Sequence, residues 1–144
     1  MKLIKKLSLA LLLIAGCQLS ANAQVVNTRK TKMLEKAYVF GFVGSFNDST
    51  VYITNIQELQ NVNTKMRSRI LDNKPLYTYQ LKEYFNKKGE QSQYTCVVFY
   101  APTRSKIQKK YNKIKKQYIT KGQGKYDVRL ISDDDFQFKV PEVD

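Results

Sequence analysis

Two runs of aromatic and β-branched residues, joined by a short polar turn, constrain the fold of this chain more than any other feature. The first run, Ala37–Phe46, has the composition of a β-strand, and Thr50–Ile56 alternates its side chains between two faces. Between them, Asn47-Asp48-Ser49 supplies short polar side chains that stabilise tight bends. The pattern predicts a β-hairpin. Gly41 and Gly44 in its first strand indicate a bulge or the close approach of another backbone.

Helical and strand patterns alternate after the hairpin. Apolar side chains at helical spacing predict a helix over Leu76–Lys88, which Pro75 would begin and Gly89 would end. The nearly all-apolar run Tyr94–Tyr100 follows, and such a run is typical of a strand that is covered on both faces.

The strongest helical periodicity lies over Ser105–Lys121, and Gly122 is placed to end this helix. Four apolar residues recur along one of its faces: Ile107, Tyr111, Ile114 and Tyr118. Tyr126–Leu130 then alternates as another strand, and residues 136–140 would add a short final one.

The predicted element order is β-β-α-β-α-β, which indicates an α+β fold. We expect a two-layer sandwich with a mixed sheet and two main helices, in which Tyr94–Ile131 forms a parallel, right-handed β-α-β unit. A three-layer α/β arrangement is the alternative. A single domain would span residues 37–140, after a flexible basic arm at residues 24–36 and before a tail at 141–144. The pattern is weakest over Gln57–Lys74, where Thr64 would cap a short helix.

The first 23 residues have the composition of an export signal. Three lysines precede a short apolar run, and Ala21-Asn22-Ala23 matches the small residues that a signal peptidase accepts, with cleavage between Ala23 and Gln24. Alternatively, Leu13–Cys17 resembles a bacterial lipobox, in which lipidation of Cys17 would make a membrane-tethered lipoprotein. Both readings place the protein outside the cytoplasm, and we favour a soluble periplasmic or secreted protein.

The composition argues against several classes of active site. The chain has no His, which excludes His-dependent triads, His-ligated zinc sites and haem ligation by His. Cys96 is the one cysteine left after cleavage, and within its apolar run we expect a buried, unreactive thiol. Asp133-Asp134-Asp135 lacks the spacing of a calcium loop and predicts a turn. No carboxylate pair stands out, so we expect a protein that is not an enzyme and that uses no metal or cofactor.

The densest chemical signal is basic. The chain carries 25 basic and 12 acidic residues, a net charge of +13. Five lysines cluster opposite the apolar face of the second helix and form what is called here the lysine face: Lys106, Lys109, Lys110, Lys113 and Lys116. No acidic residue occurs from Pro102 to Gly124, whereas a face that only keeps a protein soluble usually mixes both signs. The lysine face is either such a solvated face or an anion-binding site.

An exported chain narrows the choice of anions. Nucleic acid is not an expected partner because it lies in another compartment, and lysines act as point charges without bidentate geometry. Candidate partners are an anionic lipid, a glycolipid or an acidic protein of the cell envelope. The sequence predicts no oligomeric state.

The signal ending Leu19–Gln24 and the hairpin segment Phe40–Tyr52 resemble small uncharacterised exported proteins of Gram-negative bacteria. This resemblance implies a compartment and carries no activity. We therefore expect an exported, non-enzymatic binding or accessory domain whose basic helix contacts an anionic partner. A small carboxylate-dependent hydrolase is the alternative.

Overall fold

The computed structural model describes residues 30–66, 70–89 and 93–142. The long strand β1 (Thr31–Ser45) is the centre of its five-stranded mixed sheet. A turn leads from β1 into β2 (Thr50–Thr54), which pairs with it antiparallel. In this turn, the Asp48 carboxylate accepts a hydrogen bond of 2.7 Å from the Thr50 N–H. The predicted hairpin is confirmed.

Three further strands complete the sheet. β3 (Gln57–Lys65) continues β2 along one side of β1, and β4 (Tyr94–Ala101) pairs antiparallel with the other side. β5 (Asp127–Ile131) is parallel to β2. Among the described strands, β3, β4 and β5 each pair with one neighbour and are therefore edge strands. β4 and β5 run in the same direction, as the predicted β-α-β unit requires, but two strands lie between them.

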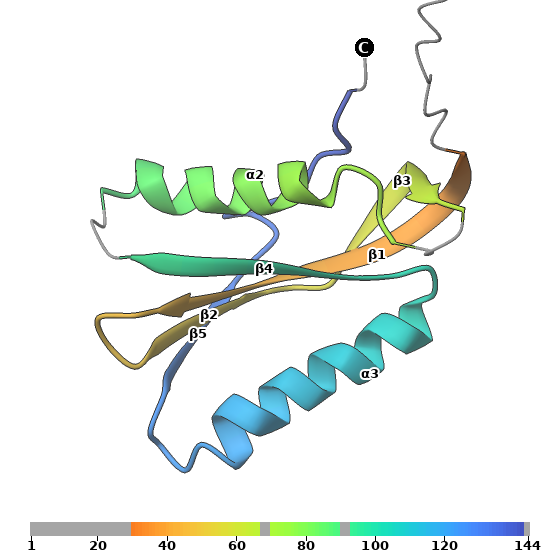
Figure 1. Cartoon of the computed structure of the whole chain (residues 1–144). Coiled ribbons are helices and arrows are strands. Elements are labelled where there is room, and N and C mark those ends of the chain that lie inside the picture. Colours follow the sequence, from red (N-terminus) through yellow and green to blue (C-terminus); the bar gives the residue numbers. More distant parts are fainter. Residues whose placement is uncertain (1–29, 67–69, 90–92, 143–144) are drawn as a thin grey trace, which may run out of the picture.

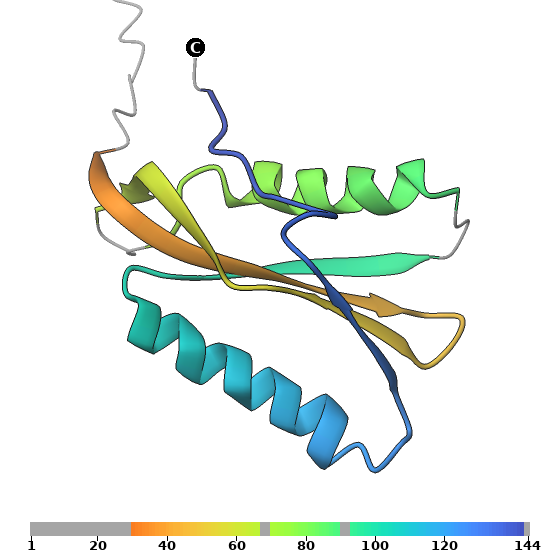
Figure 2. The same cartoon turned by 180° about the vertical axis from the view of Figure 1, so that it is seen from behind.

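The two helices, α2 (Lys74–Lys87) and α3 (Arg104–Lys115), lie on opposite faces of the sheet, as seen in Figure 1 and from behind in Figure 2. Alternate residues of β1 face each helix, with Val39 and Val43 in the core under α2 and Phe40 in the core under α3. The α+β class, the mixed sheet and the two main helices are confirmed. The strand order roughly fits the predicted two-layer sandwich, while the placement of one helix on each face is a feature of the three-layer alternative.

α2 packs closely on the sheet at Gly41 of β1. A Cβ atom at this position would lie 2.6 Å from Leu81 Cδ2 and 3.3 Å from the Phe138 ring. The Gly41 N–H donates to Thr54 Oγ1 at 2.8 Å, at the junction between β2 and β3. The missing side chain therefore lets the Leu81 side chain of α2 contact the strand directly. The sequence predicted a bulge or the close approach of another backbone, whereas a side chain is what approaches Gly41.

The last residues of the expected flexible arm and the stretch Gln57–Lys65, which has no clear pattern, form an antiparallel pair. The short helix expected after Thr64 includes residues 67–69, which lie outside the described residues. β1 begins at Thr31, inside the expected arm, and pairs with β3 from Thr31↔Lys65 to Val39↔Gln57. Thr64 does not cap a helix: it lies in β3, and its hydroxyl donates to the Lys32 carbonyl at 3.0 Å. The regular alternation is broken at Asn61, whose φ of 53° lets Leu59 and Val62 enter the same core. Because of this irregularity in a mostly polar segment, the sequence pattern did not predict β3.

The C-terminal segment is extended but is not the expected final strand. Its backbone pairs with two glutamine side chains instead of with a neighbouring strand. Gln57 donates to the Phe136 carbonyl at 2.7 Å and accepts from the Phe138 N–H at 2.8 Å. Gln80 of α2 makes the same pair of bonds with the Lys139 backbone, at 2.8 and 2.9 Å. These side chains hold Phe136 and Phe138 in the core under α2.

Candidate anion-binding groove

α3 exposes its lysines because its apolar residues are packed on the sheet. Thr103 begins the helix, since its Oγ1 accepts from the Lys106 N–H at 3.4 Å. Ile107 and Tyr111 are buried, and the Tyr111 ring meets the Phe40 ring edge-on at 5.1 Å. All five residues of the lysine face are exposed: Lys106, Lys109, Lys110, Lys113 and Lys116.

The helix ends earlier than expected. α3 stops at Lys115 and passes into a π-helical turn, η1 (Lys116–Thr120), instead of continuing to Lys121. The wider turn changes the phase of the chain, and Tyr118 packs between the rings of Phe42 and Tyr126, each 4.9 Å away. Lys116 therefore belongs to η1 and follows a different spacing from the other four lysines.

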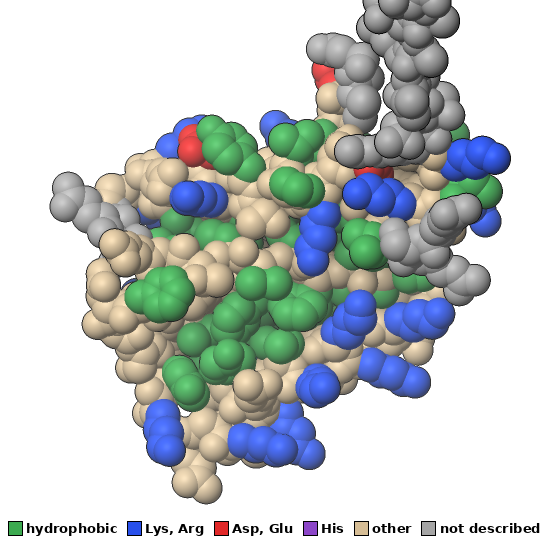
Figure 3. All heavy atoms as spheres, viewed as in Figure 1, with side chains coloured by type: hydrophobic (Ala, Val, Ile, Leu, Met, Phe, Trp, Pro, Cys, Tyr) green, Lys and Arg blue, Asp and Glu red, His purple; other side chains and the backbone are tan. Residues whose placement is uncertain are grey.

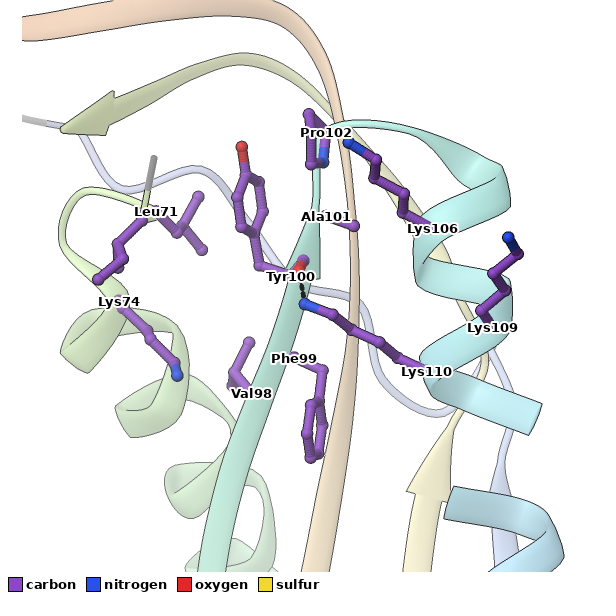
Figure 4. A pocket seen from close by; sticks show the side chains of 11 residues that line it. Leu71, Lys74, Val98, Phe99, Tyr100, Ala101, Pro102, Lys106, Lys109 and Lys110 are labelled. Atoms are coloured by element: carbon purple, nitrogen blue, oxygen red, sulfur yellow. Dashed lines mark hydrogen bonds between the residues drawn. The ribbon is translucent and has the colours of Figure 1, made fainter. Parts of the chain in front are cut away.

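A groove of about 500 Å³ lies beside the outer edge of β4. Figure 3 shows apolar side chains gathered on this face of the molecule, with Lys and Arg side chains beside them. The close view in Figure 4 shows β4 between α2 and α3, with Lys74 on the α2 side and Lys106, Lys109 and Lys110 on the α3 side. Apolar residues from β4 and from the segment before α2 also line it: Ile70, Leu71, Val98, Phe99, Tyr100, Ala101 and Pro102. This site is called the basic groove below.

One lysine reaches across the wall of the groove to the edge strand. Lys110 Nζ donates to the Tyr100 carbonyl at 2.8 Å, drawn as the dashed line in Figure 4. This carbonyl therefore points away from β1. Because backbone groups alternate in direction along an antiparallel strand, the N–H and C=O groups of Cys96 and Val98 also point outward.

The charge of the basic groove is of one sign. None of the residues that line it is acidic, and both ion pairs within the described part of the chain, Lys36–Glu58 and Arg129–Asp127, lie elsewhere. The groove also adjoins the first turns of α2 and α3, where the helix dipole adds positive potential. An anion in the groove would therefore relieve repulsion between the lysines.

The structure brings together only part of the predicted lysine face and adds one residue to it. Lys106, Lys109 and Lys110 line the basic groove, whereas Lys113 and Lys116 lie outside it. Lys74 was missed because it is a single lysine at the start of α2 with no charge pattern around it. Its proximity to α3 depends on both helices starting near the same end of β4, which no local pattern indicates.

The other residues considered for chemistry have structural surroundings. Cys96 is half-buried, less than expected, and burial raises the pKa of its thiol, which disfavours the reactive thiolate. Asp135 closes a turn by accepting from the Ser132 hydroxyl at 2.9 Å. The hydrogen bond from the Thr50 backbone lowers the pKa of Asp48, and the bond from Lys36 lowers that of Glu58. A general acid needs a shift in the opposite direction.

Several predictions concern residues outside the described ranges. The export signal, its cleavage between Ala23 and Gln24, and the lipidation of Cys17 all fall before residue 30. In the described part of the chain, no helix is both long enough and apolar enough to cross a membrane. Within the same residues, no three His, Cys, Asp or Glu side chains are grouped so that they could hold a metal ion.

No protein-family model, curated protein or solved structure matches this chain. The resemblance to small exported proteins stays a prediction, and the function is inferred from the geometry of the basic groove.

Proposed function

We propose that this protein is a non-enzymatic binding or accessory domain of the cell envelope that holds an anionic partner in the basic groove. The observation that carries the proposal is the convergence of Lys74 with Lys106, Lys109 and Lys110 on a groove that no acidic residue lines. These lysines come from two helices on opposite faces of the sheet. Their convergence goes beyond the charge pattern of a single helix.

The alternative is that the lysines only keep the protein soluble. A surface that only keeps the protein soluble does not require a groove. Acidic residues among its lysines would lower the repulsion between the lysines without reducing solubility. Here the positive groups surround an apolar hollow. An anionic partner with an apolar portion would gain both from charge and from burial of that portion.

The experiment compares two triple variants that lose the same charge. In the first, Lys74, Lys106 and Lys109 in the groove are changed to Gln. In the control, the exposed residues Lys65, Lys87 and Lys125, which do not line the groove, are changed to Gln. Binding to vesicles containing phosphatidylglycerol and to polyglutamate is measured at low and at high salt.

We expect the parent to bind at least one of these probes at low salt and to lose it as salt rises, since salt screens exposed charges beyond about 10 Å at 0.1 M. The groove variant should bind about tenfold more weakly than the control variant, because three weak charge contacts each contribute a few tenths of a kcal/mol or more. If the parent binds neither probe at low salt, or if both variants lose binding equally, the proposal is wrong.

A further inference from the structure

One edge of β4 pairs with no described strand. It contains eight residues with no proline and no charge, and among the described strands it pairs with β1 alone. Natural proteins usually protect such an edge with a short strand, a proline, a bulge or an inward-pointing charge. Among the described residues, Lys110 protects part of this edge, because its Nζ donates to the Tyr100 carbonyl. The N–H and C=O groups of Cys96 and Val98 also point outward. Cys96 is half-buried and Val98 is 1% exposed, so another extended chain could pair with the Val98 groups only after the side chains around them move aside.

The surroundings of this edge suit the side chains of an added strand. Successive side chains of an extended segment point to opposite faces of a sheet. On one face they would meet Leu71 and Lys74 beside α2, and on the other Lys106 and Lys109 of α3. Ile70, which is 49% exposed, adds apolar area to the same groove. Backbone pairing would supply affinity, and the two sides of the groove would supply selectivity.

We propose that the partner contributes an extended acidic segment that adds to the sheet as a strand along the outer edge of β4. Its Asp or Glu side chains would alternate toward the lysines of α3, and its remaining side chains would lie beside α2 and the apolar residues of the groove. This proposal rests on the proposed function and names the class of partner: a protein segment with acidic residues at alternate positions.

Charge selects this occupant over the other candidates. A second copy of this chain would bring the same lysines to the same edge, so like charges would oppose β4–β4 pairing. Lipid headgroups would meet the lysines but have no peptide backbone to pair with the edge groups of Cys96, Val98 and Tyr100. An acidic peptide strand satisfies both the lysines and the backbone.

The test uses three eight-residue peptides, matched to the length of β4, with the full exported chain. One alternates Glu and Val, a second alternates Gln and Val, and a third alternates Glu and Pro. The second lacks the charge, and the third keeps the charge but cannot form a ladder, because proline lacks an N–H. Binding is measured by titration, and amide hydrogen exchange is followed by NMR.

We expect the Glu–Val peptide to bind best and to slow exchange at the amides of Cys96, Val98 and Tyr100 by about tenfold, since hydrogen-bonded amides exchange only on opening. The Gln–Val and Glu–Pro peptides should bind about tenfold more weakly, consistent with the loss of charge or of backbone pairing. Changing Lys74, Lys106 and Lys109 to Gln should weaken the Glu–Val peptide, and the Lys65, Lys87 and Lys125 control should not.

The outcomes separate this inference from the proposed function. If all acidic probes bind in a salt-sensitive manner but the three β4 amides are not protected, the groove binds anions without strand addition and the inference is wrong. Binding to vesicles and not to the Glu–Val peptide overturns it as well, because the partner is then a membrane. If no probe binds, both proposals fail.

Discussion

At the scale of single residues, the absence of a side chain at Gly41 is as important as any side chain that is present. Leu81, Phe138 and Thr54 all lie against the space that a Cβ would occupy. Leu81 is fully buried, so it has little room to move away. Gly44 lies three residues nearer the hairpin turn and is different, because the nearest atom to a Cβ there is Phe42 Cε1, at an ordinary contact distance of 3.7 Å.

We therefore predict that Gly41→Ala destabilises the protein by about 1–3 kcal/mol through overpacking. Gly44→Ala is the matched control, because it adds the same methyl group to the same strand without a clash, and its free energy of unfolding should change little. Urea denaturation of the two variants and the parent checks this. Equal midpoints for the two variants would show that α2 does not sit against Gly41 as described.

Tyr77 is the residue at which pH should act most clearly. It is 1% exposed, and burial raises the pKa of its hydroxyl to about 12, above the ordinary value of 10.0. The unfolded chain therefore ionises first as pH rises. The contribution of neutral Tyr77 to stability is complete below pH 10 and is lost as the pH rises toward 12.

We predict that Tyr77→Phe reduces the loss of stability between pH 9 and pH 11.5, by up to about 2 kcal/mol. The Phe variant keeps the ring in the core, so it should unfold like the parent at pH 8. Denaturant midpoints of the parent and of Tyr77→Phe, measured at these three pH values, test this prediction. A parallel alkaline decline in both proteins would contradict the burial of the Tyr77 hydroxyl.

At the scale of elements, the helical periodicity of α3 predicted both its buried face and its lysine face. The 3.6-residue spacing identified both the buried residues and the exposed lysines correctly over the α-helical part. It also placed Tyr118 on the core side and Lys116 on the exposed side, but it did not indicate the π-helical turn of η1, in which Tyr118 contacts Phe42 and Tyr126. Such a contact joins distant parts of the chain and leaves no trace in local periodicity.

The face of α3 can be tested by placing a charge on it. Ile107→Asp should destabilise the domain by several kcal/mol, since Ile107 is fully buried and the carboxylate would have no partner there. Ile114→Asp should cost less, because Ile114 is only partly buried. Thermal melting of both variants gives the order. The helix face is assigned wrongly if Ile107→Asp melts like the parent.

At the scale of the whole molecule, the sequence predicted the elements better than their arrangement. The hairpin, both helices and the strands at Tyr94 and Asp127 follow from turn chemistry and periodicity, and each lies close to its expected place. β3 and the first part of β1 were missed because they are polar strands that stabilise one another, so neither has a clear pattern alone. The distribution of the helices over two faces, and with it the meeting of Lys74 with α3, depends on long-range packing.

The pairing of Gln57 with Phe136 and Phe138 joins residues 79 and 81 positions apart. The core under α2 is therefore closed by residues that follow β5 in the chain. A chain that emerges with its N-terminus first has β1, β2, β3 and α2 in place while this core still lacks its two phenylalanines. Until these two phenylalanines are available, the core under α2 stays incomplete, so a chain shortened before Phe136 should lack a closed core on this face of the sheet.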